Sequence, residues 1–263
     1  MPTVTSADGT AIVYDKHGTG PALIIVDGAL TTRRSASKPE LVALLSPRLT
    51  VLTYDRRGRG DSSDTPPYAV AREIEDIDAV IGEAGGTAAA YGHSSGACLA
   101  LDAAVALGGR VSKLAMYEAP YDNDPRARAA WDRYLGEMTE ALAAGRPGDA
   151  VALFMAFVGT PAEQIDGMRR SEFWPDLEAV GPTLAYDHAG VLGPDMSVPA
   201  ERAARVAVPT LVMHGAAGAT FMAETARALQ QAITGAELRT LAGQGHNVSP
   251  DALAPLLAEF VTR

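Results

Sequence analysis

The sequence has few of the residues on which several classes of protein depend. One of its 263 residues is cysteine, Cys98, which excludes an internal disulfide framework and any metal site built from several cysteines. No run of about 18 apolar residues is present, so no ordinary transmembrane helix is expected. Lysine occurs only three times, whereas arginine and alanine abound, a bias that we interpret as bacterial GC-rich coding.

Positive charge is scarce as well. The formal net charge is -10, and nucleic-acid binding needs a concentrated basic face, so no nucleic-acid partner is expected. The first ten residues, MPTVTSADGT, show neither the basic nor the apolar part of a secretory signal. We therefore expect a cytoplasmic protein with a small-molecule substrate and no membrane partner, present as a monomer or a homodimer.

What the sequence does contain is an alternation of short apolar runs and helix-length segments. Near-continuous apolar runs are typical of parallel strands that are buried on both faces. Strands, the last of them weaker, are predicted at 22–28, 49–55, 87–93, 112–118, 209–215 and 236–243. Helices are predicted between them at 38–45, 72–84, 97–107, 221–232 and 250–261.

This alternation stops in the middle of the chain. Helical patterns at 126–145 and 148–159 and a Pro-, Gly- and aromatic-bearing connection at 172–187 replace the strands. We predict an α/β fold with a mostly parallel, doubly wound sheet and right-handed crossovers. Its core would comprise 1–120 and 207–263, and 121–206 would form a helical cap insertion.

The segment YGHSSGA contains a G-x-S-x-G pattern centred on Ser94. The pattern alone is weak, but here it follows a predicted strand and opens a predicted helix, which is the context of a nucleophile elbow. Gly92 and Gly96 would leave room for backbone that passes close by. A serine in a plain helix N-cap is the alternative, and the context favours a nucleophile.

A serine hydroxyl needs a base, because its own pKa is far above neutral. His246 follows the last weak strand, so its ring is expected over the same edge of the sheet as Ser94. His93 adjoins the nucleophile but is expected to point the other way off the turn. The remaining histidines are interpreted as packing, surface or cap residues: His17, His188 and His214.

An oxyanion hole in such a site needs two backbone N–H donors. One is the N–H after the nucleophile, here that of Ser95, and the other comes from the loop after an earlier strand. In IIVDGALTT, Gly28 allows a tight exit from the strand and Ala29 supplies the second N–H. The alternative is a glycine that merely ends a strand.

Taken together, these segments resemble the α/β-hydrolase superfamily along nearly the whole chain. The resemblance rests on VDGAL, YDRRGRGDSS, YGHSSGA, VPTLVMHG, GQGHNVSP and the helical insertion. It implies a Ser–acid–His triad under a helical cap, with no metal or organic cofactor. Two positions depart from the family pattern: Asp27 replaces the usual histidine of the oxyanion loop, and Gly218 replaces the usual aspartate after the His-Gly pair.

Glu118 is the candidate for the missing acid. It ends the strand after the nucleophile's helix, and one right-handed βαβ step brings it to the same sheet edge as Ser94. A charge is otherwise poorly placed at the end of an apolar strand. A solvated carboxylate and a salt bridge to a cap arginine remain alternatives, and Asp187 is the second candidate acid.

Some members of the superfamily carry the acid at this earlier strand end, and the resemblance extends to two such groups. These are certain haloalkane dehalogenases and the lactonases that open zearalenone. The lactonases are the more similar, with an Asp-Gly loop, a Ser-Ser-Gly-Ala elbow and a Glu-x-Pro segment. Dehalogenases use an aspartate nucleophile, so Ser94 argues against dehalogenation.

The sequence thus predicts a serine hydrolase that cleaves a carboxylic ester or lactone, with Ser94, His246 and Glu118 as its triad. A biosynthetic acyl-enzyme catalyst (lactone-forming, cyclising or thioester-releasing) and a non-catalytic ligand-binding homologue remain alternatives. YDRRGRGDSS is interpreted as a turn held by local hydrogen bonds among Asp55, Arg57 and Asp61. Aromatic residues of the insertion are core residues by default and candidates for the substrate pocket: Trp131, Phe157, Trp174 and Tyr186.

Overall fold

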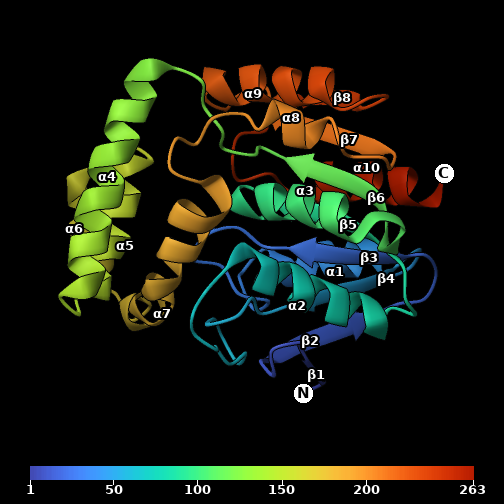
Figure 1. Cartoon of the computed structure of the whole chain (residues 1–263), viewed down its shortest axis with the longest axis horizontal. Helices are drawn as coiled ribbons and strands as arrows, with labels where there is room; N and C mark the ends of the chain where they lie inside the picture. Colours follow the sequence, from blue (N-terminus) through green and yellow to red (C-terminus); the bar gives the residue numbers. More distant parts are fainter.

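The predicted strands lie side by side in one eight-stranded sheet in the computed structural model, which describes residues 1–263 (Figure 1). The order across the sheet is β1-β2-β4-β3-β5-β6-β7-β8, and β3 to β8 are parallel. The predicted α/β fold with a mostly parallel sheet is confirmed. The strands are β1 (Thr3–Thr5), β2 (Ala11–His17), β3 (Ala22–Val26), β4 (Thr50–Tyr54), β5 (Ala88–His93), β6 (Val111–Tyr117), β7 (Thr210–Gly215) and β8 (Glu237–Leu241).

Two strands at the sheet edge were not predicted. β1 and β2 pair antiparallel with each other, and β2 pairs antiparallel with β4. The first half of β2 is buried, but its last two residues, Lys16 and His17, are exposed. A partly exposed strand of this kind lacks the continuous apolar run that marks a strand buried on both faces, so that criterion did not detect β2.

Helices cover both faces of the sheet and separate its core into two clusters. α2 (Val70–Glu83), α3 (Ser95–Leu107) and α9 (Thr220–Ala232) pack on one face, and α1 (Lys38–Leu45) and α10 (Pro250–Thr262) on the other. α10 begins at the predicted position, and Ser249 is its N-cap, with proline at the first helical position. The doubly wound arrangement places the carboxyl ends of all six parallel strands at one edge.

The insertion between β6 and β7 is helical, and it stands beside the sheet in Figure 1. Its longest helices are the two that the sequence predicts. The prediction of a connection without helices at 172–187 is wrong. A helix begins there at Trp174 with a proline in its first turn, and a π-helix follows at Tyr186. The elements are α4 (Pro125–Ala143), α5 (Pro147–Phe157), α6 (Ala162–Arg169), α7 (Trp174–Val180), the 3-10 helix η2 (Gly181–Thr183), the π-helix η3 (Tyr186–Leu192) and α8 (Ala200–Ala203).

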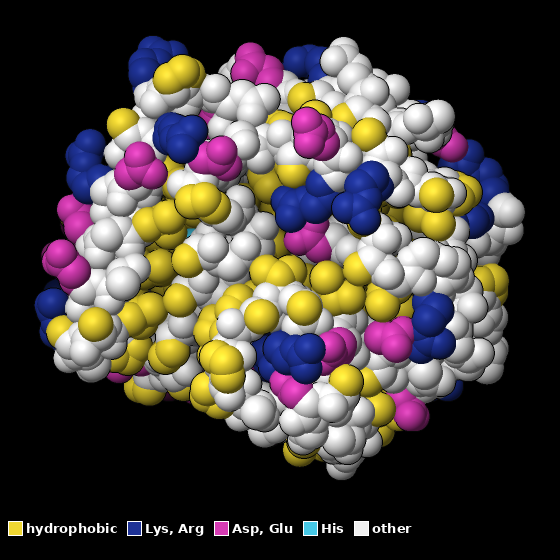
Figure 2. Space-filling view, viewed as in Figure 1, with side chains coloured by type: hydrophobic (Ala, Val, Ile, Leu, Met, Phe, Trp, Pro, Cys, Tyr) yellow, Lys and Arg dark blue, Asp and Glu magenta, His cyan; other side chains and the backbone are white.

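The surface carries charges of both signs. In Figure 2 the Lys and Arg side chains are interspersed with Asp and Glu, and hydrophobic side chains gather on the side of the cap helices. None of the helices combines the length and the apolar character that crossing a membrane would need.

The turn after β4 is held by long-range contacts, which corrects the local interpretation of this segment. Arg57 binds both carboxylate oxygens of Asp76 in α2, at 2.8 and 2.7 Å, and reaches Asp8 at 2.8 Å. Asp55 does accept a local bond from the Asp61 N–H at 3.0 Å, but it also binds Arg33. The arginines of this turn therefore point into the protein and join β4 to neighbouring elements.

The crossing of α3 over β3 gives a test of the packing. A Cβ atom on Gly96 would lie 2.2 Å from the carbonyl oxygen of Val26, whereas one on Gly136, in an exposed part of α4, would meet nothing within 4 Å. We expect Gly96→Ala to lower the free energy of unfolding by about 1–3 kcal/mol, because the helix must move off the sheet. Gly136→Ala should raise the free energy of unfolding by up to about 1 kcal/mol, because alanine has a higher helix propensity than glycine.

Urea denaturation of both variants measures this difference. Equal midpoints for the two variants would contradict the close approach of α3 to β3.

Candidate active site

Ser94 occupies a strained turn between β5 and α3. Its backbone has φ 57° and ψ -130°, a conformation that non-glycine residues rarely adopt and that is found at functional sites. A Cβ atom on Gly92 would lie 2.3 Å from the carbonyl oxygen of Gly96, so only glycine fits there. The Ser94 N–H donates to the carbonyl of Tyr117 at 3.0 Å, which fixes the turn against the end of β6. This is the geometry of a nucleophile elbow.

Glu118 and His246 meet directly at the carboxyl edge of the sheet. His246 Nδ1 lies 2.8 Å from Glu118 Oε2, and Glu118 Oε1 accepts from the Gly215 N–H at 2.9 Å. The Glu118 side chain is fully buried, and 43% of the His246 side chain is exposed. Burial acts to raise the pKa of Glu118, but the hydrogen bonds from His246 and Gly215 lower it below its usual value.

The contact between these side chains has a chemical consequence. A carboxylate that accepts from Nδ1 keeps the proton of a neutral imidazole on that nitrogen and leaves Nε2 as the acceptor. This orientation would suit His246 as a base, and the buried carboxylate would stabilise the imidazolium that forms when it takes a proton.

Gly218 lies against the same carboxylate. A Cβ atom placed on Gly218 would be 2.8 Å from Glu118 Oε1. The position where the family pattern has an aspartate is therefore next to the side chain of Glu118. The two positions are about 100 residues apart in the sequence and adjacent in the fold.

The loop that carries His246 is held by groups that the sequence did not indicate. His93 Nε2 lies 2.9 Å from the carbonyl oxygen of His246, and the Tyr117 hydroxyl donates to the carbonyl of Gly245 at 2.6 Å. Burial, followed by the neighbouring His246, lowers the pKa of His93 to about 3, so its ring is neutral and donates this bond. His93 thus supports the base, although its place beside the nucleophile gave no sign of this.

The two expected oxyanion donors lie on either side of Ser94. A Cβ atom on Gly28 would lie 2.9 Å from the His93 carbonyl oxygen and 3.0 Å from Ser94 Cβ, so the loop after β3 passes directly beside the nucleophile. The Ala29 N–H has no acceptor in the chain. The Ser95 N–H is the first of α3 and has no intrahelical acceptor, as at any helix start. Both N–H groups are therefore available to a negative oxygen.

Asp27, which replaces the histidine of the family pattern, does not leave its charge free in the site. It is buried and forms an ion pair with the buried Lys38 at the start of α1. The pair connects the oxyanion loop to the helix layer behind the sheet.

Two of the four aromatic residues considered for the pocket belong to one cluster in the cap. The rings of Trp131 and Phe157 are 5.5 Å apart, and both pack against Tyr134. The Trp131 indole donates to the carbonyl of Gly193 at 3.1 Å, and Tyr134 binds His188 Nδ1 at 2.7 Å. This cluster connects α4 and α5 to the π-helix η3.

The other two aromatic residues lie elsewhere. Trp174 is buried beneath the guanidinium of Arg169, 5.3 Å from its ring. Tyr186 stacks on Tyr68 with ring centroids 3.9 Å apart, and its hydroxyl donates to Asp64 at 2.5 Å. The contact of Trp174 attaches α7 to α6, and the contacts of Tyr186 attach η3 to the core.

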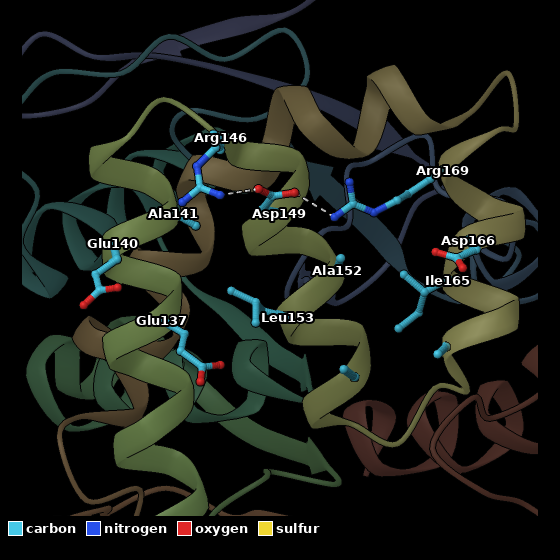
Figure 3. Close-up of a pocket in the computed structure, with 12 residues that line it drawn as sticks. Glu137, Glu140, Ala141, Arg146, Asp149, Ala152, Leu153, Ile165, Asp166 and Arg169 are labelled. Atoms are coloured by element: carbon cyan, nitrogen blue, oxygen red, sulfur yellow. Dashed lines mark hydrogen bonds and ion pairs between the residues drawn. The ribbon is translucent and has the colours of Figure 1, made fainter.

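The cap contains a hollow of its own, away from this site. It measures about 480 Å³ and lies among α4, α5 and α6 of the cap, lined by Leu153 and Ile165 among others (Figure 3). Asp149 binds Arg146 and Arg169 across it, at 2.7 and 2.8 Å. Acidic side chains outnumber the two arginines in its lining, and it contains none of the residues around Ser94.

Comparison with known proteins identifies the same fold and its relatives. A family model described as "Alpha/beta hydrolase family" matches residues 17–257. An alpha/beta hydrolase from Sphaerobacter thermophilus is 45% identical, with 98% of this chain and 99% of that chain covered and a TM-score of 0.87. A hydrolase from Pseudomonas aeruginosa is 25% identical, with 100% and 98% covered and a TM-score of 0.74.

A similar fold is found in an enol-lactonase from Burkholderia xenovorans. It is 22% identical, covers 100% of each chain and has a TM-score of 0.66, a likeness that concerns the fold alone. No curated protein matches the chain significantly.

The contact between Gly218 and Glu118 gives a prediction. We expect Gly218→Asp to lower the kcat of the otherwise unchanged protein on an ester, because a second carboxylate would crowd and repel Glu118. In a Glu118→Ala background the same aspartate should restore part of the lost activity, because the space beside Gly218 is then free. The measurement is kcat/KM of the two single variants and the double variant. A protein markedly activated by Gly218→Asp alone would contradict the role of Glu118.

Proposed function

The chain belongs to the α/β-hydrolase family, and we propose that within it this protein is a serine hydrolase that cleaves a carboxylic ester or lactone. The observation that carries the proposal is the hydrogen bond between His246 Nδ1 and the buried Glu118, at the same sheet edge as the strained Ser94. A nucleophile, a base and an orienting acid are the three parts that acyl transfer through serine needs.

The first half of the reaction forms an acyl-enzyme. His246 Nε2 takes the proton of the Ser94 hydroxyl as the oxygen attacks the carbonyl carbon of the substrate. The N–H groups of Ser95 and Ala29 hold the oxyanion that results. As the tetrahedral intermediate collapses, the bond to the alcohol oxygen breaks and His246 returns the proton to that oxygen.

The second half releases the acid. His246 takes a proton from water, the hydroxide attacks the acyl carbon, and the Ser94 oxygen leaves with the proton from His246. With an open-chain ester the alcohol departs before this step. With a lactone the alcohol stays attached to the acyl group, so that one hydroxy acid is the only product.

The buried carboxylate of Glu118 serves both halves in the same way. Because hydrogen bonds lower its pKa, it is charged at neutral pH and faces an imidazole that becomes positive in each transition state. Removal of such an acid from a serine triad costs up to about 10⁴-fold in kcat. The side chain of Asp187 has other partners, Arg56, Arg59 and Ser95, and none of its contacts is with His246.

Lactone hydrolysis is supported by a likeness in sequence. The chain resembles lactonases that carry their acid after the corresponding strand, whereas the enol-lactonase from Burkholderia xenovorans shares the fold alone. Esterases from Thermogutta terrifontis and a Rhodococcus species share it equally, so the proposal includes both kinds of ester. A panel of p-nitrophenyl esters and lactones of increasing ring size separates the two.

The nucleophile and the base are tested together. Ser94→Ala and His246→Ala should each lower hydrolysis of a p-nitrophenyl ester by at least about 10⁴-fold, because they remove the attacking oxygen or its base. Ser197→Ala, a hydroxyl removed from a cap loop, is the control and should retain full activity. A fluorophosphonate probe should label the unchanged protein at Ser94 and leave Ser94→Ala unlabelled. Failure to label the unchanged protein would favour a ligand-binding role, and full activity of Ser94→Ala would refute the mechanism.

The assignment of Glu118 as the triad acid is tested by comparing the loss of kcat on substitution of Glu118 and of Asp187. Glu118→Gln should lower kcat by up to about 10⁴-fold, and by more than Asp187→Asn does, because only Glu118 contacts the base. Steady-state kinetics at saturating ester give both values. If Asp187→Asn has the larger effect, the proposed triad is wrong.

A further inference from the structure

Asp187 belongs to the cap but is bound by the core. It lies in the π-helix η3 and is fully buried. Its Oδ1 accepts from the Ser95 hydroxyl at 2.8 Å and from Arg56 Nη1 at 2.5 Å, and its Oδ2 accepts from Arg59 Nη2. One cap carboxylate therefore has three partners in the core, one of which is the residue after the nucleophile.

The same two arginines hold the oxyanion loop. Arg56 Nη1 donates to the carbonyl of Asp27 at 3.1 Å, and Arg59 Nη1 donates to the carbonyl of Gly28 at 2.6 Å. The Thr31 hydroxyl donates to the Gly28 carbonyl as well, also at 2.6 Å. The start of the loop is thus held through its carbonyl oxygens, which leaves the Ala29 N–H unused.

The bonds to the Gly28 carbonyl fix the direction of the next N–H. In a trans peptide the carbonyl of one residue and the N–H of the next lie in one plane and point in opposite directions. Rotation of the peptide between Gly28 and Ala29 would turn the Ala29 N–H away and would break both bonds to the carbonyl. A hydrogen bond from a charged donor is stronger than one from a neutral donor, so Arg59 strongly favours one orientation.

The charges of this network cancel within the protein. Arg56 also binds both carboxylate oxygens of Glu73 at 2.6 Å, so that two guanidinium groups face two carboxylates, and none of the four residues is more than 1% exposed. Burial acts to raise the pKa of Asp187, but Arg56 and Arg59 hold it at about 2, so the carboxylate is charged. Without that charge, one buried positive charge would be left without a partner, which is costly.

We propose that Asp187 is a positioning residue for the oxyanion hole, which it holds on both sides, through the Ser95 hydroxyl and through Arg56 and Arg59. The inference rests on the proposed function. It adds a dependence that the triad does not contain, because Arg56, Arg59 and the Ser95 hydroxyl share their carboxylate only while η3 is seated on the core. Docking of the cap and formation of the oxyanion hole then depend on the same contacts of Asp187.

The test compares two buried carboxylates of similar burial. Asp187→Asn removes the charge that joins the arginines to Ser95, and the control Asp76→Asn removes the partner of Arg57, which does not touch the oxyanion loop. Loss of one oxyanion donor costs about 10²–10³-fold in kcat, so a loosened hole should cost about 10–100-fold. We expect that loss for Asp187→Asn with little change in KM, and the kcat of the unchanged protein for Asp76→Asn, although both variants melt at lower temperature.

Two further readouts separate positioning from a general loss of structure. The affinity for a trifluoromethyl ketone, whose adduct with Ser94 carries an oxyanion, should fall in Asp187→Asn by the same factor as kcat/KM. Fluorophosphonate labelling should still reach one per chain, but more slowly, and the shape of the pH profile should not change. Ser95→Ala keeps the N–H and both ion pairs and removes only the tether, so a smaller loss of the same kind is expected even if Asp187→Asn does not fold.

The outcomes are distinct. A kcat like that of the unchanged protein in Asp187→Asn, or in Ser95→Ala where Asp187→Asn does not fold, overturns the inference and leaves the proposed function intact. An equal loss of kcat in Asp76→Asn assigns the effect to stability and overturns the inference as well. An unchanged protein that neither hydrolyses esters nor reacts with the probe overturns the proposed function and, with it, the inference.

Discussion

The hydrogen bond between His246 and Glu118 joins a loop to the end of a buried strand. His246 comes from a loop after the last strand, whereas Glu118 ends a buried strand and is fixed by the N–H of Gly215 at the end of the next strand. The Glu118 carboxylate is therefore held in one position. Hydrogen bonds from His93 and Tyr117 hold the loop of His246 beside it. Because β5, β6, β7 and β8 are adjacent and parallel, their carboxyl ends bring these groups together at one edge of the sheet.

A second constraint is the set of charges enclosed between cap and core. A buried ion pair rarely adds stability relative to apolar residues, because desolvation offsets the attraction between the charges. Such a network nevertheless fixes the position of the cap on the core, because Arg56 and Arg59 bind all their partners in only one placement of η3. Apolar packing, such as that of Trp131 against Phe157, tolerates small displacements of the cap, whereas these short charged contacts do not.

The sequence was informative wherever one physical demand dominates a segment. Strands buried on both faces need continuous apolar runs, and the sharp turn at Ser94 needs small residues around it, so these features were predictable. Strand β2 and helix α7 were not, because β2 is half exposed and the Pro and Gly residues around α7 are equally typical of a loop. The contacts of Asp187 with Arg56 and Arg59 join residues more than 100 positions apart, and no local pattern encodes them.

The proximity of Gly218 to Glu118 also bears on how such sites change over evolutionary time. Two alternative positions for an acid lie side by side in space, and a side chain at one crowds the carboxylate at the other. A lineage that moves its acid from one strand to the other therefore cannot accumulate both carboxylates at no cost and then discard one. The placement of the acid behaves as a choice between two exclusive states, which makes it a trait by which branches of descent can be recognised.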